Sequence, residues 1–480
     1  MSGLGRLDTR SELPALVVGT GMTAVVVLGS TRYGAGVGLA SILALALFVA
    51  TTICFLAAPH LAVAITIPLF AVIPVAKVLV ASGVGPVKDA VTLSAALATA
   101  LHVLQKEGRQ TLDRIDRVVL AAIGLLVALY VLNAGGLYSE SWHGDQWLQG
   151  VRLVTEPLIL LLAGLLLPRP TRTVAWAAAS LVATGCVVAL VGITQQLVGA
   201  GRLVGFGYSY DQQLTTIGGF FRSFGTLDDA FAYAAFLFLA LVTVVFWMRR
   251  GALAVACGAL IGVGIGVSFV QTAAVILGAL LALWMVRAGH TAAGFILFAA
   301  AACAVVALTI ATAPATQSRT VRAGPSTYLT LNGRTSVWAT VFADESKVPL
   351  GLGVGAVGRA AERAQRGISD VSGSPDQPKV GQIAVDSGYF AAVADIGIVG
   401  FAALLLLLLR LLVLARRATK VPGNVAGWLC MGYLTVMILD ASTRDSFTGF
   451  PNAYLGYLLV GITLAATREE DRQHRPAVSH

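Results

Sequence analysis

The sequence predicts an all-α protein, a polytopic bundle of about 12–14 transmembrane helices with a long, partly helical extracytoplasmic loop. Hydrophobic residues make up 57% of the 480-residue chain and charged residues only 12%, unlike the balance of a soluble domain. The mean hydropathy is +0.82. Between charged clusters, nearly every stretch is an apolar run of about 17–25 residues, which suits a membrane-crossing helix and is too long for a barrel strand.

The apolar runs predict about fourteen spans, each bounded by charged or turn-forming residues. In chain order they are residues 13–29, 37–58, 61–81, 89–105, 118–136, 152–168, 173–198, 229–247, 251–267, 272–286, 292–312, 385–414, 425–441 and 452–467. The first run also has the length of a signal-peptide core, but the many spans that follow favour a transmembrane helix.

Lysine and arginine concentrate in alternate short loops, which predicts that these loops and both termini are cytoplasmic. The residues concerned are Arg6, Arg10, Lys106, Arg109, Arg114, Arg117, Arg169, Arg172, Arg249, Arg250, Arg287, Arg416, Arg417, Lys420, Arg468, Arg472 and Arg475. The formal net charge of +9 reflects this bias and does not imply a nucleic-acid partner.

The predicted organisation has four parts. Residues 1–312 hold the first eleven membrane helices and an outer loop at about 199–228, residues 313–384 form a large outer loop, residues 385–467 hold the last three helices, and residues 468–480 form a cytoplasmic tail. Long loops in a compact protein are usually functional or disordered. Apolar residues at helical spacing over 336–342 predict that part of the large loop is a helix on the membrane face.

Metal and nucleotide motifs are not supported by the sequence. The five cysteines lie within apolar runs without paired ligand spacing, so we expect core residues and predict no metal site and no cofactor. Gly353, Gly355 and Gly358 form a G-x-G-x-x-G pattern. A dinucleotide site would need a preceding strand, a following helix, a later acidic residue and a compartment that supplies nucleotide, whereas this pattern lies in the exported loop. A flexible turn whose N–H groups approach an anion is the favoured interpretation.

Two outer-loop arginines precede predicted helices. Arg222 lies just before the helix that opens at Asp228 and Asp229, and Arg334 lies where a helix is expected to begin. Because a guanidinium offers a rigid fork of donors and a helix start adds a positive dipole end, two such residues facing one cavity are suited to a diphosphate. The alternative for each arginine is contact with lipid headgroups or a helix-cap salt bridge.

Acidic residues enter the apolar run that begins at residue 385. Such carboxylates are costly near hydrocarbon unless they are paired or face a wet cavity. Asp386 and Tyr389 share one helix face, with Gly397 and Gly400 deeper on that side. Asp395 lies on the other face and is expected to be a structural partner for another helix.

Four cationic residues approach the predicted outer membrane boundary, namely Lys77, Lys88, Arg152 and Arg444. Snorkelling to the interface is the ordinary explanation for such side chains. Contact with an anionic substrate is the alternative, and on that basis we assign Lys77, Arg152 and Arg444 to substrate binding. Glu156, one turn into its span, is expected to need a cationic partner.

Three motifs, in order, resemble the O-antigen ligase and O-antigen polymerase superfamily of bacterial membrane proteins. They are "FFRSFGTLDDAFAYAAFLFLAL", "LNGRTSVWATVFADESKVPLGLGVGAVG" and "VDSGYFAAVADIGIVGFAAL". The resemblance implies a metal-independent glycosyltransferase at the outer face of the cytoplasmic membrane. Such an enzyme moves a glycan from an undecaprenyl diphosphate carrier to an acceptor sugar.

The resemblance also implies roles for particular residues. Arg222 and Arg334 would bind the diphosphate and stabilise its developing charge. Asp386 stands where ligases typically have His and polymerase-like members more often have an acid, so it would accept the proton of the acceptor hydroxyl. Ser387 stands where Asn is common, and Tyr389 would orient the acceptor or stack on sugar. A further departure is Gln271, where many relatives have Arg.

The leading functional hypothesis is therefore a surface-polysaccharide polymerase, with an O-antigen-type ligase second. A non-enzymatic transporter or flippase of the lipid-linked glycan is the alternative from another class. A flippase should line a path through the membrane centre with charge, whereas the charges here collect at the predicted outer end, which favours transfer. The expected partners are the lipid-linked donor, the glycan acceptor and the bilayer; the sequence leaves the oligomeric state open.

Overall fold

A computed structural model describes the chain from residue 37 to residue 474 with several gaps. The described residues are 37–79, 84–132, 144–208, 214, 216–217, 220–249, 251–270, 272–290, 292–294, 296, 349–351, 387–444 and 446–474. They form an all-α bundle, as predicted, with one small hairpin in which β1 (Thr216–Ile217) pairs antiparallel with β2 (Phe220–Phe221).

The helices follow the predicted spans closely. They are α2 (Val37–Ala57), α3 (Pro59–Leu79), α4 (Pro86–Leu104), α5 (Lys106–Leu112), α6 (Arg117–Leu132), α7 (Gly144–Leu166), α8 (Pro170–Val198), α9 (Ala200–Gly205), α10 (Ala230–Trp247), α11 (Ala252–Gly266), α12 (Thr272–Arg287), α17 (Gly388–Thr419), α18 (Val425–Asp440) and α19 (Asn452–His474). Three helices extend well beyond the prediction: α7 starts before residue 152, α17 continues past residue 414 and α19 continues past residue 467. The short helices α5 and α9 were not predicted. The predicted span 13–29 and most of 292–312 lie outside the described residues.

The bundle has the character of a multi-pass membrane protein. Among the described residues, five helices are long and apolar enough to cross a membrane: α3, α4, α8, α10 and α17. The pair α5 and α6, bent by 92° at the break between them, passes the same test when taken together. Shorter apolar helices, including α11, α12 and α18, pack among them.

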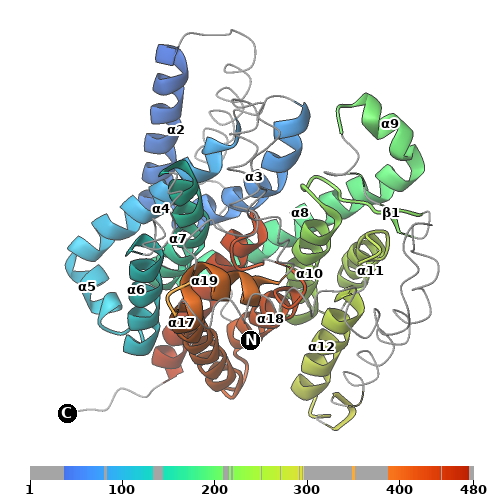
Figure 1. Ribbon diagram of the computed structural model, residues 1–480. Helices are drawn as coiled ribbons and strands as arrows, with labels where there is room; N and C mark the ends of the chain where they lie inside the picture. The colour runs from blue at the N-terminus through green and yellow to red at the C-terminus, as the bar shows by residue number, and fades with distance from the viewer. Residues whose placement is uncertain are drawn as a thin grey trace.

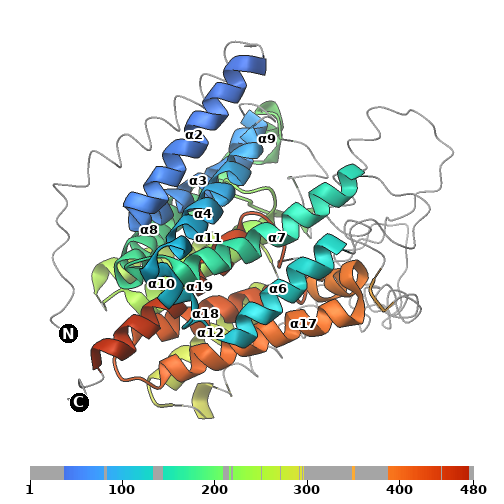
Figure 2. The ribbon, with the colours of Figure 1, turned by 90° about the vertical axis from the view of Figure 1, so that its left-hand side faces the viewer.

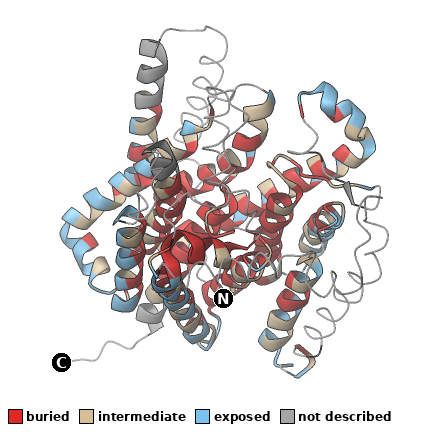
Figure 3. Cartoon of the chain, viewed as in Figure 1, coloured by how far each residue is buried: buried red, intermediate tan, exposed pale blue. Residues whose placement is uncertain are grey.

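The core of the bundle is formed by α10, α18 and α19, which lie at its centre (Figure 1). Buried residues concentrate on these helices, whereas exposed positions lie on outer helices such as α5 and α12 (Figure 3). Because α10 is apolar on all sides, it suits a central position, where Phe236 and Phe238 are fully buried. A hydroxyl pair, Thr243 with Tyr433 at 2.8 Å, joins α10 to α18.

Small residues bring α7 and α19 into close contact. A Cβ atom added to Gly164 would lie 2.7 Å from the Leu458 carbonyl oxygen, and one added to Gly461 would lie 2.5 Å from that of Leu161. Glycine therefore allows the two backbones to touch, as it does in other membrane helix pairs. Because both helices are rigid, this contact also sets the relative orientation of their first turns.

Helix α17 is interrupted, although its sequence predicts a continuous run. Gly397 has φ 66° and ψ −171°, a conformation that is essentially restricted to glycine. A Cβ atom at this position would lie 2.1 Å from the carbonyl oxygen of Pro349. The short described piece of the large loop, residues 349–351, thus packs directly on the break.

The predicted outer ends of the spans meet at one end of the bundle, called the site end below. Lys88 at the start of α4 contacts Tyr454 at the start of α19, at 3.0 Å. The N–H of Gly388 at the start of α17 donates to the carbonyl of Ala441, just after α18, at 2.9 Å. These contacts between helix ends agree with the predicted topology, in which successive membrane helices run in alternating directions.

Candidate functional site

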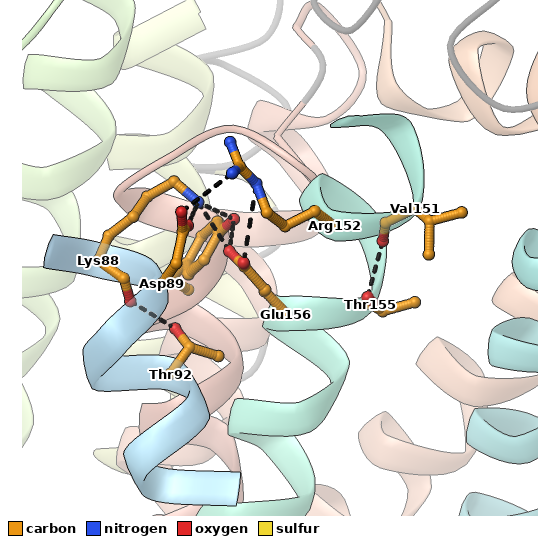
Figure 4. Close-up of polar contacts among 8 residues, drawn as sticks. Lys88, Asp89, Thr92, Val151, Arg152, Thr155 and Glu156 are labelled. Atoms are coloured by element: carbon orange, nitrogen blue, oxygen red, sulfur yellow. Dashed lines mark hydrogen bonds and ion pairs between the residues drawn. The ribbon is translucent and has the colours of Figure 1, made fainter. Parts of the chain in front are cut away.

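Five polar side chains from α4, α7 and α19 form a buried network at the site end, called the Lys88 network (Figure 4). Lys88 Nζ donates to Asp89 Oδ1 at 2.5 Å and to Glu156 Oε2 at 2.7 Å. It also donates to the Tyr454 hydroxyl, which in turn donates to Glu156. Arg152 Nη1 lies 3.0 Å from Asp89 Oδ2. The network contains two cations and two carboxylates, so its charges balance.

Burial makes this balance necessary. Lys88 is 2% exposed and Glu156 is 5% exposed, and an unpaired charge at such a depth costs several kcal/mol. The predicted cationic partner of Glu156 is confirmed, and it is Lys88. Snorkelling, the ordinary explanation for Lys88, is wrong, because the ammonium points inward to three partners.

An aromatic bridge links the network to the chain that follows α18. Lys77 Nζ lies 5.8 Å and Lys88 Nζ 5.9 Å from the ring centroid of Phe450, within the range of a cation–π contact. The Phe450 ring also meets the Tyr454 ring edge-on at 5.3 Å. The Phe450 ring therefore places Lys77 next to the Lys88 network, to which Arg152 also belongs.

A second polar group surrounds the start of α10. Asp229 caps this helix by accepting the N–H of Ala232 at 2.6 Å. Oδ2 of the same carboxylate accepts a hydrogen bond from Arg444 Nη2 at 3.4 Å. Nearby, Asn452 Nδ2 donates to the Ala232 carbonyl at 2.8 Å, which ties the start of α19 to the same turn.

Arg444 is the least satisfied of the buried cations. Only 7% of the residue is exposed, so it does not snorkel into solvent. Its Nε and Nη1 atoms have no hydrogen-bond partner among the described residues. Because buried donors are nearly always paired, these two nitrogens indicate a place where an anion can bind.

Arg222 lies near enough to the start of α10 for the charge of Asp229 to act on its guanidinium. Its Nε donates to the Ser268 carbonyl at 3.3 Å and its Nη2 to that of Phe269 at 3.4 Å, while the guanidinium carbon lies 4.6 Å from the Phe231 ring centroid. Burial lowers the pKa of Arg222, and the charge of Asp229 opposes that change. The guanidinium remains cationic at neutral pH, because its usual pKa is far above 7.

The segment that carries Arg222 is held by α8. Gln195 Nε2 donates to the Gly225 carbonyl at 2.7 Å, and its Oε1 accepts from the N–H groups of Phe224 and Gly225. Gln196 Nε2 donates to the Phe221 carbonyl at 2.8 Å. Arg222 is therefore placed by a rigid helix end and not by a free loop.

The start of α17 is anchored to the turn that contains Arg444. The N–H of Gly388 donates to the carbonyls of Ala441 at 2.9 Å and of Arg444 at 2.8 Å. Ser387 Oγ donates to the Ala441 carbonyl at 3.2 Å, and the Tyr389 hydroxyl to that of Ile438 at 2.9 Å. The hydroxyl groups of Ser387 and Tyr389 therefore both donate to backbone carbonyls, a role that the sequence did not indicate.

A small cavity lies deeper, beside the buried Asp395. It measures about 20 Å³ and is lined in part by Gly388, Thr448, Tyr130 and Tyr457. This volume is enough for a single water molecule. No arginine lines the part of this cavity that the described residues form.

The structure brings most of the predicted site residues to one end of the bundle, in two groups. Arg152 belongs to the Lys88 network, and Lys77 lies beside it over the Phe450 ring. Arg444 pairs with Asp229, whose charge also acts on Arg222, and the turn of Arg444 holds the start of α17 with Ser387 and Tyr389. Arg334 and Asp386 lie outside the described residues. Sequence reasoning missed Asp89 and Tyr454, since neither carries a local signal for a partner on another helix.

No protein-family model and no curated protein sequence matches the chain. Within the described residues, no group of three or more His, Cys, Asp or Glu side chains could hold a metal ion. The buried guanidinium of Arg444 is a rigid fork of donors, a geometry suited to the oxygens of an anion such as phosphate.

Proposed function

We propose that the protein is a membrane glycosyltransferase that moves a glycan from an undecaprenyl diphosphate carrier to an acceptor sugar. Its proposed place is the outer face of the bacterial cytoplasmic membrane, and its proposed product is a surface polysaccharide, so that it acts as a polymerase. The observation that carries the proposal is Arg444, a buried guanidinium with two donors that have no partner in the described part of the chain.

Arg444 and Arg222 would together grip the diphosphate. Two observations support this role: Arg444 pairs with Asp229, and the charge of Asp229 also acts on Arg222. Charge-assisted hydrogen bonds from arginine to phosphate oxygens are strong and directional. Arg334 would complete the clamp from the large loop, and Lys77 and Arg152 would add positive potential nearby.

The proposed reaction needs no redox change. The acceptor hydroxyl oxygen attacks the anomeric carbon of the donor, the bond from that carbon to the diphosphate oxygen breaks, and the polyprenyl diphosphate leaves with the electron pair. The arginines neutralise the charge that develops on this leaving group. The hydroxyl proton passes to the carboxylate of Asp386, which acts as the general base.

The anchored start of α17 supports the assignment of Asp386. Ser387 and Gly388 follow it directly, and their bonds to Ala441 and Arg444 hold the helix entry beside the arginine turn. A base must be positioned within hydrogen-bond reach of the proton that it removes, and a fixed helix entry provides such positioning. Tyr389 would contribute its ring face to the sugar while its hydroxyl holds Ile438.

The deciding experiment uses the full-length protein reconstituted in lipid with a labelled, diphosphate-linked oligosaccharide. Longer lipid-linked products mean polymerisation, and a labelled second acceptor means ligation. Movement of the donor between leaflets without a new glycosidic bond would overturn the assignment to a transferase and support a flippase.

The role of Asp386 is tested in the same system. Asp386→Asn should slow the single-turnover rate far more than it weakens donor binding, because the amide cannot accept the proton. An unchanged single-turnover rate would exclude Asp386 as the base while leaving the arginine clamp in place.

A further inference from the structure

A second cavity lies at the opposite end of the bundle from the candidate site. It has a volume of about 260 Å³ and lies between the turn before α6, the last turns of α17 and the later part of α19. Helices α6 and α17 lie side by side (Figure 2), and the cavity lies where α6 begins and α17 ends. Nothing in the proposed transfer reaction uses this cavity.

Three arginines line the cavity: Arg114, Arg417 and Arg468. The carboxylate in the lining, Asp116, is already bound by Arg410, whose Nε donates to Oδ1 at 3.0 Å. Arg114 and Arg417 are exposed, and neither guanidinium has a hydrogen-bond or ion-pair partner among the described residues. Arg114 and Arg417 therefore present positive charge to the cavity that the described residues do not neutralise.

Arg468 is held at the wall by backbone. Its Nη2 donates to the Leu165 carbonyl at 3.3 Å and its Nε to the Leu464 carbonyl at 3.4 Å. These contacts hold the third guanidinium at the wall of the cavity. An adjoining cavity of about 200 Å³ shares Arg114 and Arg468 but also contains Glu107 and Glu469, so it is less suited to an anion.

Apart from Thr467, the remaining walls are apolar. They come from Val119, Leu165, Leu411, Leu414 and Leu464, on helices that belong to the membrane-crossing bundle. A cavity with a basic rim and an aliphatic floor matches a phosphate ester attached to acyl chains. Basic pockets of this kind between membrane helices bind anionic lipid headgroups.

We propose that this cavity, lined by Arg114, Arg417 and Arg468, binds the headgroup of an anionic phospholipid. The phosphate would contact the arginines, and the start of an acyl chain would lie along the leucines. The apolar floor favours a lipid over free phosphate, which would leave that surface uncovered. The inference is independent of the transferase proposal, since it concerns the other end of the bundle.

Native mass spectrometry of the full chain, titrated with phosphatidylglycerol, tests the proposal. Arg114→Gln/Arg417→Gln should weaken the tightest lipid binding by about 25-fold, because each arginine near an anionic lipid contributes about fivefold. The matched control, Arg249→Gln/Arg416→Gln, removes the same charge from exposed arginines outside the cavity and should change binding less than about twofold. Arg114→Lys/Arg417→Lys should recover most of the affinity.

Two further arms distinguish the possible sources of the phosphate. Phosphatidylcholine with the same acyl chains should bind much more weakly, and an excess of inorganic phosphate should leave phosphatidylglycerol bound. Equal weakening in the cavity and control variants, equal affinity for the two lipids, or displacement by inorganic phosphate would each overturn the proposal.

Discussion

Arg444 and Asp229 form an ion pair across 215 residues of sequence, with Nη2 and Oδ2 at 3.4 Å. The pair joins the turn after α18 to the start of α10. Since the N–H of Gly388 donates to the Arg444 carbonyl at 2.8 Å, the same turn also places the entry of α17. One arginine thus links the proposed anion site to the helix that follows Asp386.

We expect Arg444→Gln to lower the transfer rate by about 100-fold or more, because removal of one donor to a developing charge typically costs about 10²–10³ in rate. Arg444→Lys should recover only part of the loss, since an ammonium lacks the planar fork. Transfer from the labelled lipid donor in proteoliposomes measures both effects.

Arg202→Gln is the matched control for that loss. Arg202 is an exposed arginine in α9, and its replacement changes the charge equally without touching the site. If Arg444→Gln folded normally, judged by its thermal midpoint, and transferred glycan at the rate of Arg202→Gln, the diphosphate would not be held by Arg444.

The Lys88 network predicts strong coupling between α4 and α7. Lys88→Met should destabilise the bundle by about 3–5 kcal/mol, because Glu156 and Asp89 are left without their buried cation. Lys88→Met/Glu156→Leu should cost clearly less than the sum of the two single changes. Chemical unfolding of the four proteins in the double-mutant cycle gives the coupling free energy.

Lys106→Met serves as the control for this cycle. Lys106 is exposed at the start of α5, so the same substitution should change the free energy of unfolding by less than about 0.5 kcal/mol. Additive effects of Lys88→Met and Glu156→Leu would show that the two groups do not stabilise each other.

The pair of Asp116 and Arg410 predicts a pH-dependent contribution to stability. The hydrogen bond from Arg410 lowers the pKa of Asp116 below its usual range. A lowered folded-state pKa stabilises the protein above the unfolded pKa of about 3.9, and this stability is lost as the pH falls through the folded value. Asp116→Asn should therefore lower the thermal midpoint modestly at pH 7, and the difference should shrink at acid pH.

The Asp116→Asn substitution removes the ion pair with Arg410 but keeps the helix cap, so the two effects can be measured apart. Asp116 Oδ1 also accepts the N–H groups of Val118 and Val119, and the amide oxygen of Asn can do the same. Asp113→Asn, at an exposed neighbouring acid, is the control. A difference between wild type and Asp116→Asn that stays constant from neutral to acid pH would rule out the charge as its cause.

The break in α17 predicts that Gly397 does not tolerate a side chain. Gly397→Ala should destabilise the bundle by about 1–3 kcal/mol or more, because alanine is strained at this φ and ψ and its Cβ meets the Pro349 carbonyl. Gly262→Ala is the contrasting control, since it lies in α11 with open space around its Cβ position and should be neutral or slightly stabilising. Equal thermal midpoints for the two variants would mean that residues 349–351 do not pack on the break.

The helices of the bundle could be predicted from sequence because hydrocarbon imposes a simple rule on composition. The run that becomes α10 is predicted at 229–247 and observed at Ala230–Trp247, since charged or polar residues flank it on both sides. The boundaries of α7 are less well predicted because the helix begins within the polar residues from Gly144 onward. An apolar run does not show where a helix begins when the first residues of that helix are polar.

The sequence predicts what type of partner a site residue needs, but it does not show which residue provides it. Glu156 in an apolar run requires a cation, but nothing local selects Lys88, which lies 68 residues away, or Tyr454, which lies 298 residues away. The break at Gly397 was also missed, because glycines in a membrane run were interpreted as packing residues. A conformation with positive φ leaves no trace in an apolar pattern.

The contact between Gly351 and Gly397 places both described ends of segment 352–386 at one helix. Gly351 packs on the break in α17, and Ser387 precedes the first residue of the same helix. The conformational free energy of joining two fixed points grows only slowly with the length of the connecting chain. A change in the length of segment 352–386 can therefore leave the register of every described helix unaltered.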